Sequence, residues 1–298
     1  MILITIQHMS PSKKSIISFL ILLSLLTACA NNKRANEEPI TLYKPELIIY
    51  CENGVISPIY EISKYFEIRY SCKVTIQNGN VRNLTSMIDL TNDGDIFIPD
   101  TNYGFDLLSK KNKNIINDSL YIGTNKLVYM FPKGNLERFD GKLESLSQKK
   151  HAVIIANPET SSLGHKTREV LLSKDLYNQV INNIMTLSID SRGLIQSIVN
   201  EEATLTVDWL SSYYDNNNSE KIDTMHFMPS VPDLDIYAST LSTSKNPGLA
   251  QTFLAVLSSP QAVEILKNHG IEKKHASLII SQAFNTWNEN TNKNKKDR

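Results

Sequence analysis

The chain has 298 residues, which suits one large domain or two ordinary ones. Its 41% hydrophobic and 21% charged residues exclude wholesale disorder, and 31 basic against 31 acidic residues leave a formal net charge of zero, which does not indicate a nucleic-acid partner. Three cysteines are too few for a disulfide scaffold.

The N-terminal segment is typical of a secretory signal. Two lysines precede the apolar run Ile16–Leu26, whose ~16 Å of helix is about half of a membrane's hydrocarbon core. The run ends in the tetrapeptide LTAC, which resembles the bacterial lipobox, and a polar stretch follows it. We therefore expect a lipoprotein signal peptide over residues 1–28, acylation of Cys29, and a polar linker over 29–44.

Acyl chains on Cys29 would anchor the protein to a membrane of the cell envelope, on its extracytoplasmic side.

Cys51 and Cys72 would then lie in an oxidising compartment, where a disulfide can form. They are expected at the end of one strand and the start of the next parallel strand, at opposite edges of the sheet and more than ~10 Å apart, beyond the reach of a disulfide. We predict two unpaired, buried thiols.

From Pro45 onward the sequence alternates between strand and helix patterns. Short apolar runs predict strands over 47–51, 73–77 and 95–98. Ser57 and Pro58 suit the start of a helix that extends to Tyr70, because Ile59, Ile62 and Phe66 recur at helical spacing. A second helix is indicated by apolar residues over 84–88. This β-α-β-α-β order predicts a parallel sheet with right-handed crossovers.

A second unit with the same rhythm begins at Lys126. Strands are predicted over 126–131, 151–156, 187–189, 203–207, 225–228 and 236–241. Helices are predicted over 164–172, 193–200, 249–257 and 260–268, and a further helix over 276–287 precedes a polar tail.

Motifs for catalysis and metal binding are absent from the sequence. The six histidines form neither HxH nor HExxH, and there is no GxGxxG, GxxxxGK[ST] or GxSxG motif. Paired carboxylates such as Glu37-Glu38 and Glu201-Glu202 suit a solvated surface. We therefore predict that the protein is not an enzyme and expect no cofactor and no bound metal.

Polar residues follow the predicted strands where ligands bind in open parallel sheets. They form the segments Glu52–Gly54, Asn78–Asn80, Pro99–Thr101, Asn157–Gly164 and Asp190–Gly193, and nearly all of these lead into a helix. Helix starts present backbone N–H groups together with the positive end of the helix dipole, which favours an anion. Alternatively, these residues only cap the helices, as in any α/β sheet.

Several longer stretches match a known family in order and spacing. They are LIIYCENGVISPIYEISKYFE, KVTIQNGNVRNL, DIFIPD, NKLVYMFPKGN, IIANPETSSLGHKTREVL, DSRGLIQSIVNEEATLTV and STSKNPGLAQTFLAVLSSPQAVEILKNHGI. Through them, residues 47–270 resemble the type II extracytoplasmic solute-binding proteins of ABC importers, most closely the periplasmic molybdate/tungstate-binding family.

The resemblance implies an α/β protein with the two-lobed periplasmic-binding-protein type II fold. Each lobe would be a mostly parallel sheet flanked by helices, and two crossing segments would join the lobes. Lobe 1 would comprise 45–124 and 234–271, lobe 2 would comprise 125–233, and 272–298 would form a helical extension with a polar tail. The ligand would lie in the cleft between the lobes.

The family's ligand-binding positions can be carried over residue by residue. The expected ligand-binding residues are Asn53, Gly54, Asn80, Val81, Asp100, Ser162, Leu163, Ser191 and Trp209. Gly54 and Trp209 stand where the family has hydroxyl-bearing serine and tyrosine, so two hydroxyl donors are lost.

Three acidic residues near these loops complicate an anion site. A carboxylate of Glu52, Asp100 or Asp208 facing an oxyanion a few ångströms away would repel it. Either these side chains point away from the ligand, or the ligand is not a bare dianion.

The resemblance implies a monomeric, lipid-anchored solute-binding protein that takes a small oxyanion of the molybdate/tungstate class and delivers it to an ABC permease. Its partners would be the solute, the permease and, through acylated Cys29, the lipid bilayer, with no nucleic acid. Tyr213-Tyr214 raises the alternative of ferric ion, because phenolate oxygens suit a hard cation. A further alternative is that the protein binds another small polar or organic solute. On this resemblance, a lipoprotein that has lost transport and acts in sensing or interaction is another alternative.

Overall fold

The computed structural model describes residues 44–228 and 231–273. The strands of this part are β1 (Glu46–Glu52), β2 (Lys73–Gly79), β3 (Ile96–Ile98), β4 (Ile116–Asn125), β5 (Leu127–Pro132), β6 (Ile154–Ala156), β7 (Thr186–Ser188), β8 (Thr206–Trp209), β9 (Ile222–His226) and β10 (Leu234–Leu241). Its α-helices are α2 (Ile56–Tyr70), α3 (Val81–Thr91), α4 (Asn102–Lys111), α5 (Ser162–Leu172), α6 (Tyr177–Ile181), α7 (Ser191–Val199), α8 (Leu210–Tyr214), α9 (Pro247–Leu257) and α10 (Pro260–Asn268). Short 3-10 segments lie at Asn53–Val55, Leu143–Ser147 and Asn218–Glu220.

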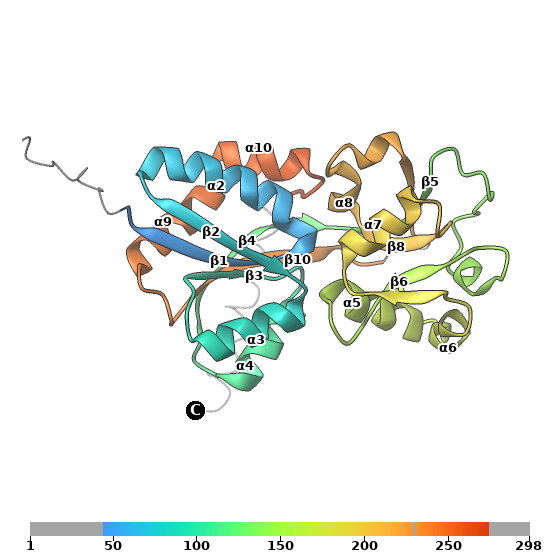
Figure 1. Cartoon of the computed structure of the whole chain (residues 1–298), viewed down its shortest axis with the longest axis horizontal. Helices are drawn as coiled ribbons and strands as arrows, with labels where there is room; N and C mark the ends of the chain where they lie inside the picture. The colour runs from blue at the N-terminus through green and yellow to red at the C-terminus, as the bar shows by residue number, and fades with distance from the viewer. Residues whose placement is uncertain (1–43, 229–230, 274–298) are drawn as a thin grey trace, which may run out of the picture. The chain divides into compact units, whose positions relative to one another are not determined.

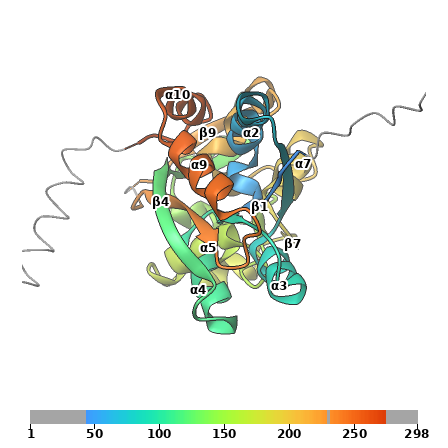
Figure 2. The same cartoon turned by 90° about the vertical axis from the view of Figure 1, so that its left-hand side faces the viewer.

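A five-stranded sheet with the order β2-β1-β3-β10-β4 forms the centre of lobe 1 (Figure 1). β1 pairs in parallel with β2 and β3, whereas β10 pairs antiparallel with β3 and β4. Helices α2, α9 and α10 cover one face and α3 and α4 the other (Figures 1 and 2). The apolar stripe of Ile59, Ile62 and Phe66 explains how α2 packs, because all three side chains are buried against this sheet.

Lobe 2 contains a three-stranded antiparallel sheet, β8-β5-β9, and the parallel pair β6-β7. A parallel bridge between Val153 and Leu205 connects the two groups of strands. Residues of α5, α6 and α7 pack with β5, β6 and β8 into one hydrophobic core. The lobe therefore has its own core, separate from the two clusters that cover the faces of the first sheet.

The chain passes from lobe 1 to lobe 2 at Lys126 and returns between β9 and β10. The predicted α/β class is confirmed, but neither lobe has a mostly parallel sheet: the sheet of lobe 1 is mixed, and lobe 2 combines an antiparallel sheet with a parallel pair of strands. The reason lies at the crossings, because β4, β5, β9 and β10, which lead into and out of them, all pair antiparallel with their neighbours. Only β2-β1-β3 and β6-β7, with the bridge to β8, keep the parallel arrangement.

The predicted alternation of strand and helix is present, and the differences follow from polar edges. β4 was not predicted, because its first half, Ile116–Ser119, is mostly polar and exposed at the end of the sheet. The segment 151–156 forms a strand only over its last three residues. Among the described residues no single helix is long and apolar enough to cross a membrane, and only the bent pair α9 and α10 meets that test jointly.

Cys51 and Cys72 are free and buried, which confirms the prediction of unpaired thiols. Cys51 pairs in register with Asn78 at the far end of β2, whereas Cys72 immediately precedes that strand. The predicted signal peptide, Cys29 and the linker up to residue 43 lie outside the described residues, as does the predicted helix over 276–287.

Candidate functional site

The loops that follow β1, β2 and β3 contact helix starts of lobe 2, and all described residues belong to one compact unit. Arg82, at the start of α3, donates its N–H to the Thr160 carbonyl at 3.1 Å and its Nη1 to the Glu159 carbonyl at 3.0 Å. Ser211 of α8 donates its hydroxyl to the Gly54 carbonyl at 2.5 Å. The two lobes are thus in direct contact where the sequence predicted a ligand site.

Glu52, the last residue of β1, holds the centre of this contact. Its carboxylate accepts the Asp100 N–H at 3.0 Å, the Ser162 N–H at 2.9 Å and the Ser162 hydroxyl at 2.6 Å. The side chain is only 2% exposed. Burial raises the pKa of Glu52, and hydrogen bonds from Ser162, Asp100 and the Val81 N–H oppose that rise.

Asp100 lies next to Glu52 and receives fewer donors. Its Oδ2 accepts the indole N–H of Trp209 at 2.9 Å and the Gly54 N–H at 3.3 Å, while its buried Oδ1 has no partner among the described residues. Burial, and then the Glu52 carboxylate, raise the pKa of Asp100 well above its usual range. Because Glu52 receives more hydrogen bonds than Asp100, the effect of burial on the pKa is opposed more strongly at Glu52.

Asp208, in β8, forms a third buried carboxyl group. Both of its oxygens accept the Ser191 hydroxyl, at 2.7 and 2.6 Å, and Oδ1 also accepts the Trp209 N–H at 2.6 Å and the Ser212 hydroxyl at 3.3 Å. Burial raises the pKa of Asp208 to about 7. We call Glu52, Asp100 and Asp208 the carboxyl cluster.

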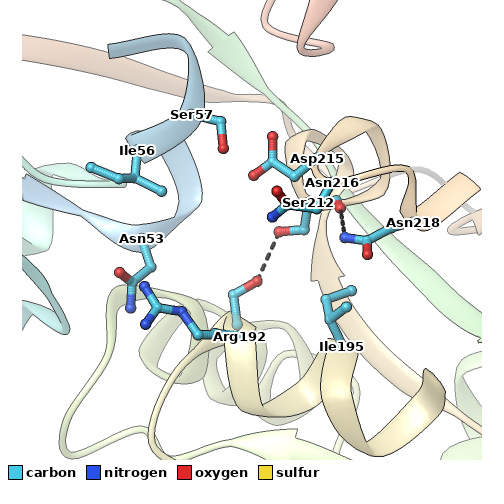
Figure 3. Close-up of a pocket in the computed structure, with 10 residues that line it drawn as sticks. Asn53, Ile56, Ser57, Arg192, Ile195, Ser212, Asp215, Asn216 and Asn218 are labelled. Carbon is cyan, nitrogen blue, oxygen red and sulfur yellow. Dashed lines mark hydrogen bonds between the residues drawn. The ribbon is translucent and has the colours of Figure 1, made fainter. Parts of the chain in front are cut away.

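A polar cavity of about 140 Å³ adjoins the carboxyl cluster. It is lined by Asn53, Ile56, Ser57, Ser191, Arg192, Ile195, Ser212, Asp215, Asn216 and Asn218. Figure 3 shows the Ser57 hydroxyl and the Asp215 carboxylate pointing toward one another, with Asn53 and Arg192 along another side. Lobe 1 contributes the start of α2, and lobe 2 contributes α7, α8 and the segment after α8. We call this space the Arg192 cavity.

The two charged residues of the Arg192 cavity differ in their partners. Asp215 receives a hydrogen bond from Nδ1 of His269 at 3.1 Å, and this bond is the main cause of the raised pKa of His269. The Arg192 side chain is exposed and has no hydrogen bond or ion pair within residues 44–228 and 231–273. Asp215 is therefore paired with His269, whereas the guanidinium of Arg192 remains available to an anion.

Comparisons with known proteins agree with this architecture. Residues 47–272 match the model of a family described as bacterial extracellular solute-binding protein. This chain belongs to that family. The family binds small solutes, works with ABC permeases and is extracytoplasmic, and its members are binding proteins rather than enzymes. No curated protein matches the sequence significantly.

Solved structures share the fold of this solute-binding protein at low sequence identity. The periplasmic molybdate-binding protein of Azotobacter vinelandii is 15% identical, with a TM-score of 0.63 over 77% of this chain and 100% of that one. A periplasmic thiamin-binding protein is 17% identical, with a TM-score of 0.65 over 77% and 83%. Iron-bound HitA from Pseudomonas aeruginosa is 16% identical, with a TM-score of 0.61 over 75% and 84%. These likenesses show the type II periplasmic-binding-protein fold.

Most of the predicted ligand-binding residues of this family member contact the carboxyl cluster. Gly54 and Trp209 donate to Asp100, Val81 and Ser162 donate to Glu52, and Ser191 donates to Asp208. Two of the predicted residues have structural contacts instead. Asn80 caps α3 by accepting the Asn83 N–H, and Leu163 is buried in the core of lobe 2. Asn53 bonds to Asp190 and lines the Arg192 cavity.

The expectation that the cleft is lined by free main-chain donors is wrong for Gly54, Asp100 and Ser162. Their N–H groups already bind carboxyl oxygens of the chain itself. The side chains of Glu52 and Asp100 are buried among these loops, where their oxygens accept the N–H groups of Asp100, Ser162 and Gly54.

Sequence reasoning missed Arg192, Ser57 and Asp215 as site residues. Arg192 and Ser57 were visible in polar segments before helices, but nothing in the sequence separates an unpaired arginine from a paired one. For the ferric alternative, Tyr213 packs against the core of lobe 2 while Tyr214 is half exposed. The part of the chain that the structure describes holds no group of three or more His, Cys, Asp or Glu suited to a metal ion.

Proposed function

We propose that this solute-binding protein is a lipoprotein that captures a small oxyanion or carboxylate in the Arg192 cavity and delivers it to an ABC permease. The observation that supports the ligand class is the unpaired guanidinium of Arg192 in a polar space between the lobes. A guanidinium offers five donors in a planar fork that matches the oxygens of such anions.

The size of the Arg192 cavity supports a solute of few atoms. Its volume of about 140 Å³ lies below the roughly 300–1,000 Å³ of sites for drug-sized ligands. The start of α2 has no side-chain cap and adds the positive end of a helix dipole to the Ser57 hydroxyl. These groups favour an anion over the thiamin or iron bound by the structural relatives.

Asp215 narrows the choice of anion further. Its carboxylate can only accept hydrogen bonds unless it is protonated, so it favours a solute that carries an O–H or N–H group beside its negative charge. Hydrogenphosphate and small hydroxycarboxylates meet this condition. Molybdate and tungstate are fully deprotonated at neutral pH and do not, so we rank them below the protonated oxyanions.

A titration of the purified protein tests this ligand class. Phosphate, glycolate, molybdate and tungstate would be added at constant ionic strength while heat and melting temperature are recorded. We expect phosphate or glycolate to bind and Arg192→Gln to weaken that binding at least tenfold, because a charge-assisted hydrogen bond is lost. Lys110→Gln is the matched control, since it removes one positive charge from an exposed site on α4.

Two results would contradict the proposal. Equal binding by the wild type and the Arg192→Gln variant would exclude the Arg192 cavity as the site. Tighter binding of molybdate than of phosphate would restore the molybdate class and remove the role of Asp215.

The lipid anchor is supported by the N-terminal sequence alone. We propose that Cys29 is acylated after removal of residues 1–28, since the LTAC tetrapeptide follows a short apolar run. Cys29→Ala should release the protein from the membrane fraction, and a variant that still sediments with membranes after signal removal would contradict the anchor.

The contacts of the carboxyl cluster favour one second candidate, a lipoprotein of this fold that no longer transports and acts in sensing or interaction. Glu52 supplies two of the hydrogen bonds that join the lobes, and Arg82 and Ser211 supply others, so contact between the lobes needs no solute. Small-angle X-ray scattering would separate the candidates. A transporter should change its radius of gyration with solute, whereas the second candidate should keep the same radius with every anion tested.

A further inference from the structure

The Glu52 carboxylate occupies a position built from the starts of helices α3 and α5 and the segment that leads into α4. Its donors are the Val81 N–H at the start of α3, the Asp100 N–H just before α4, and the N–H and hydroxyl of Ser162 at the start of α5. These helices have 10 or 11 residues each and come from both lobes. Converging N–H groups and helix dipoles make an anion-binding position.

The occupant of this position is part of the chain, and it is fully enclosed. Glu52 is 2% exposed, its hydrogen bonds from Asp100 and Ser162 are 2.6–3.0 Å long, and the shortest, from the Ser162 hydroxyl, has the length of a charge-assisted bond. The neighbouring carboxyl group of Asp100 is also buried, and its Oδ2 accepts the Trp209 indole N–H and the Gly54 N–H.

We infer that Glu52 is a tethered anion that excludes diffusible anions from the loop junction and links lobe 1 to lobe 2 through Ser162. If the proposed function holds, this exclusion directs the solute to the Arg192 cavity. The inference stands on the contacts of Glu52 and does not require the proposed solute of the Arg192 cavity.

The chemistry of the side chain provides a direct test. Glu52→Ala removes one methylene and one carboxylate, and acetate supplies the same four non-hydrogen atoms. Free acetate should therefore enter the vacated space and accept the bonds from Asp100 and Ser162 that Glu52 accepted. A buried donor that loses its acceptor is costly, so the variant should melt roughly 5–15 °C lower in chloride and recover much of this loss in acetate.

The experiment compares melting temperatures in sodium acetate and sodium chloride at equal ionic strength and pH 7. The wild type and Glu52→Gln, in which the space stays filled, should show no specific response to acetate. Glu264→Ala, which removes an exposed carboxylate from α10, is the matched control and should behave as the wild type does. Carbon-13 NMR of labelled acetate should show bound ligand for Glu52→Ala alone.

The double variant Glu52→Ala, Arg192→Gln distinguishes this inference from the proposed function. Its rescue by acetate must persist, because the Arg192 cavity takes no part. A folded Glu52→Ala variant that ignores acetate, or a wild type that responds equally, would overturn the inference. If Glu52→Ala does not fold in sodium chloride, its refolding in sodium acetate tests the inference. Recovery of the folded variant in acetate supports the tethered anion, and failure to fold in both salts contradicts it.

Discussion

The carboxyl cluster and the Arg192 cavity lie side by side and use the same kind of loop, yet their donors differ. In the cluster, the N–H groups of Gly54, Asp100 and Ser162 all bind buried carboxyl oxygens of the chain. In the cavity, the Arg192 guanidinium has no partner among the described residues. Polar loops at helix starts therefore differ in their ability to bind a solute, because a single side chain such as Glu52 can accept hydrogen bonds from several of them.

The largest expected effect concerns the buried charge of the cluster. Burial raises the pKa of Asp208 to about 7, whereas the unfolded chain has a value near 3.9. The folded state thus binds the proton more tightly. The bound proton of Asp208 therefore stabilises the folded protein. This contribution is complete below about pH 4 and is lost as the pH rises through 7, a change on the order of 4 kcal/mol in the free energy of unfolding.

Urea unfolding of the wild type and Asp208→Asn between pH 4.5 and 8 measures this contribution. The variant should show a weaker decline of stability with pH, because asparagine does not titrate. Asp106→Asn, on an exposed part of α4, should leave the decline as it is. Parallel profiles for the wild type and Asp208→Asn would mean that Asp208 is charged in the folded protein.

The next effect tests how tightly the cluster is packed at Gly54. A Cβ at this position would lie 2.4 Å from Cδ1 of Trp209 and 2.7 Å from Oδ2 of Asp100. We expect Gly54→Ala to lower the free energy of unfolding by about 1–3 kcal/mol. Restoring the serine of the molybdate group at this position should therefore destabilise the protein rather than restore an oxyanion site.

Gly248→Ala in α9 is the matched glycine control, since no heavy atom lies within 4 Å of a Cβ built there. It should raise stability by up to about 1 kcal/mol, because alanine favours helix. Denaturation midpoints of the two variants would be compared, and a stable Gly54→Ala protein would mean that Trp209 can move away from Gly54.

A pair of serines compares the two regions directly. Ser162 donates its hydroxyl to Glu52 at 2.6 Å, whereas the Ser57 hydroxyl lines the cavity and has no side-chain hydrogen bond in the described chain. Ser162→Ala should cost about 1.5–3 kcal/mol of stability, as expected for a bond to a charged group. Ser57→Ala should change stability by less than about 0.5 kcal/mol and weaken solute binding instead.

Chemical denaturation and phosphate titration of both serine variants give the two readouts. If Ser57→Ala were as destabilising as Ser162→Ala, the cavity would belong to the structural core and not to a binding site.

Local patterns predicted the fold well where burial is two-sided. The buried run of β1, the Ser57-Pro58 helix start and the spacing of Ile59, Ile62 and Phe66 all depend on neighbours in sequence, so they could be recognised from sequence alone. The exposed edge of β4 gave no such signal. Antiparallel pairing at the crossings also depends on the return of distant strands, which no local pattern encodes.

The site was predictable as a set of loops but not as a set of bonds. Glu52 and Ser162 are 110 residues apart, and their contact follows from how the lobes meet. The sequence showed that Glu52, Asp100 and Asp208 lie near the predicted ligand position, and therefore that a bare dianion is disfavoured. It could not show that the Glu52 carboxylate accepts hydrogen bonds from the N–H groups of these loops, since this depends on one rotamer of a buried side chain.

A smaller loss of stability is expected at a contact between the lobes that contains no carboxylate. Tyr103 of α4 stacks on His165 of α5, with ring centroids 3.8 Å apart and planes 12° apart. Burial lowers the pKa of His165, so the neutral ring is favoured in the folded protein and this contribution is lost as the pH falls below about 6.5. Tyr103→Leu should cost about 0.5–1.5 kcal/mol at pH 8.

The same variant separates the stack from the Glu52 link as the contact that keeps the lobes together. If Glu52 is sufficient, Tyr103→Leu should keep the radius of gyration of the wild type in small-angle scattering, whereas Glu52→Ala in chloride should increase it. Tyr60→Leu, on the exposed side of α2, is the control for loss of an aromatic ring. An increase in radius for Tyr103→Leu alone would make the stack, and not the tethered carboxylate, the main link between the lobes.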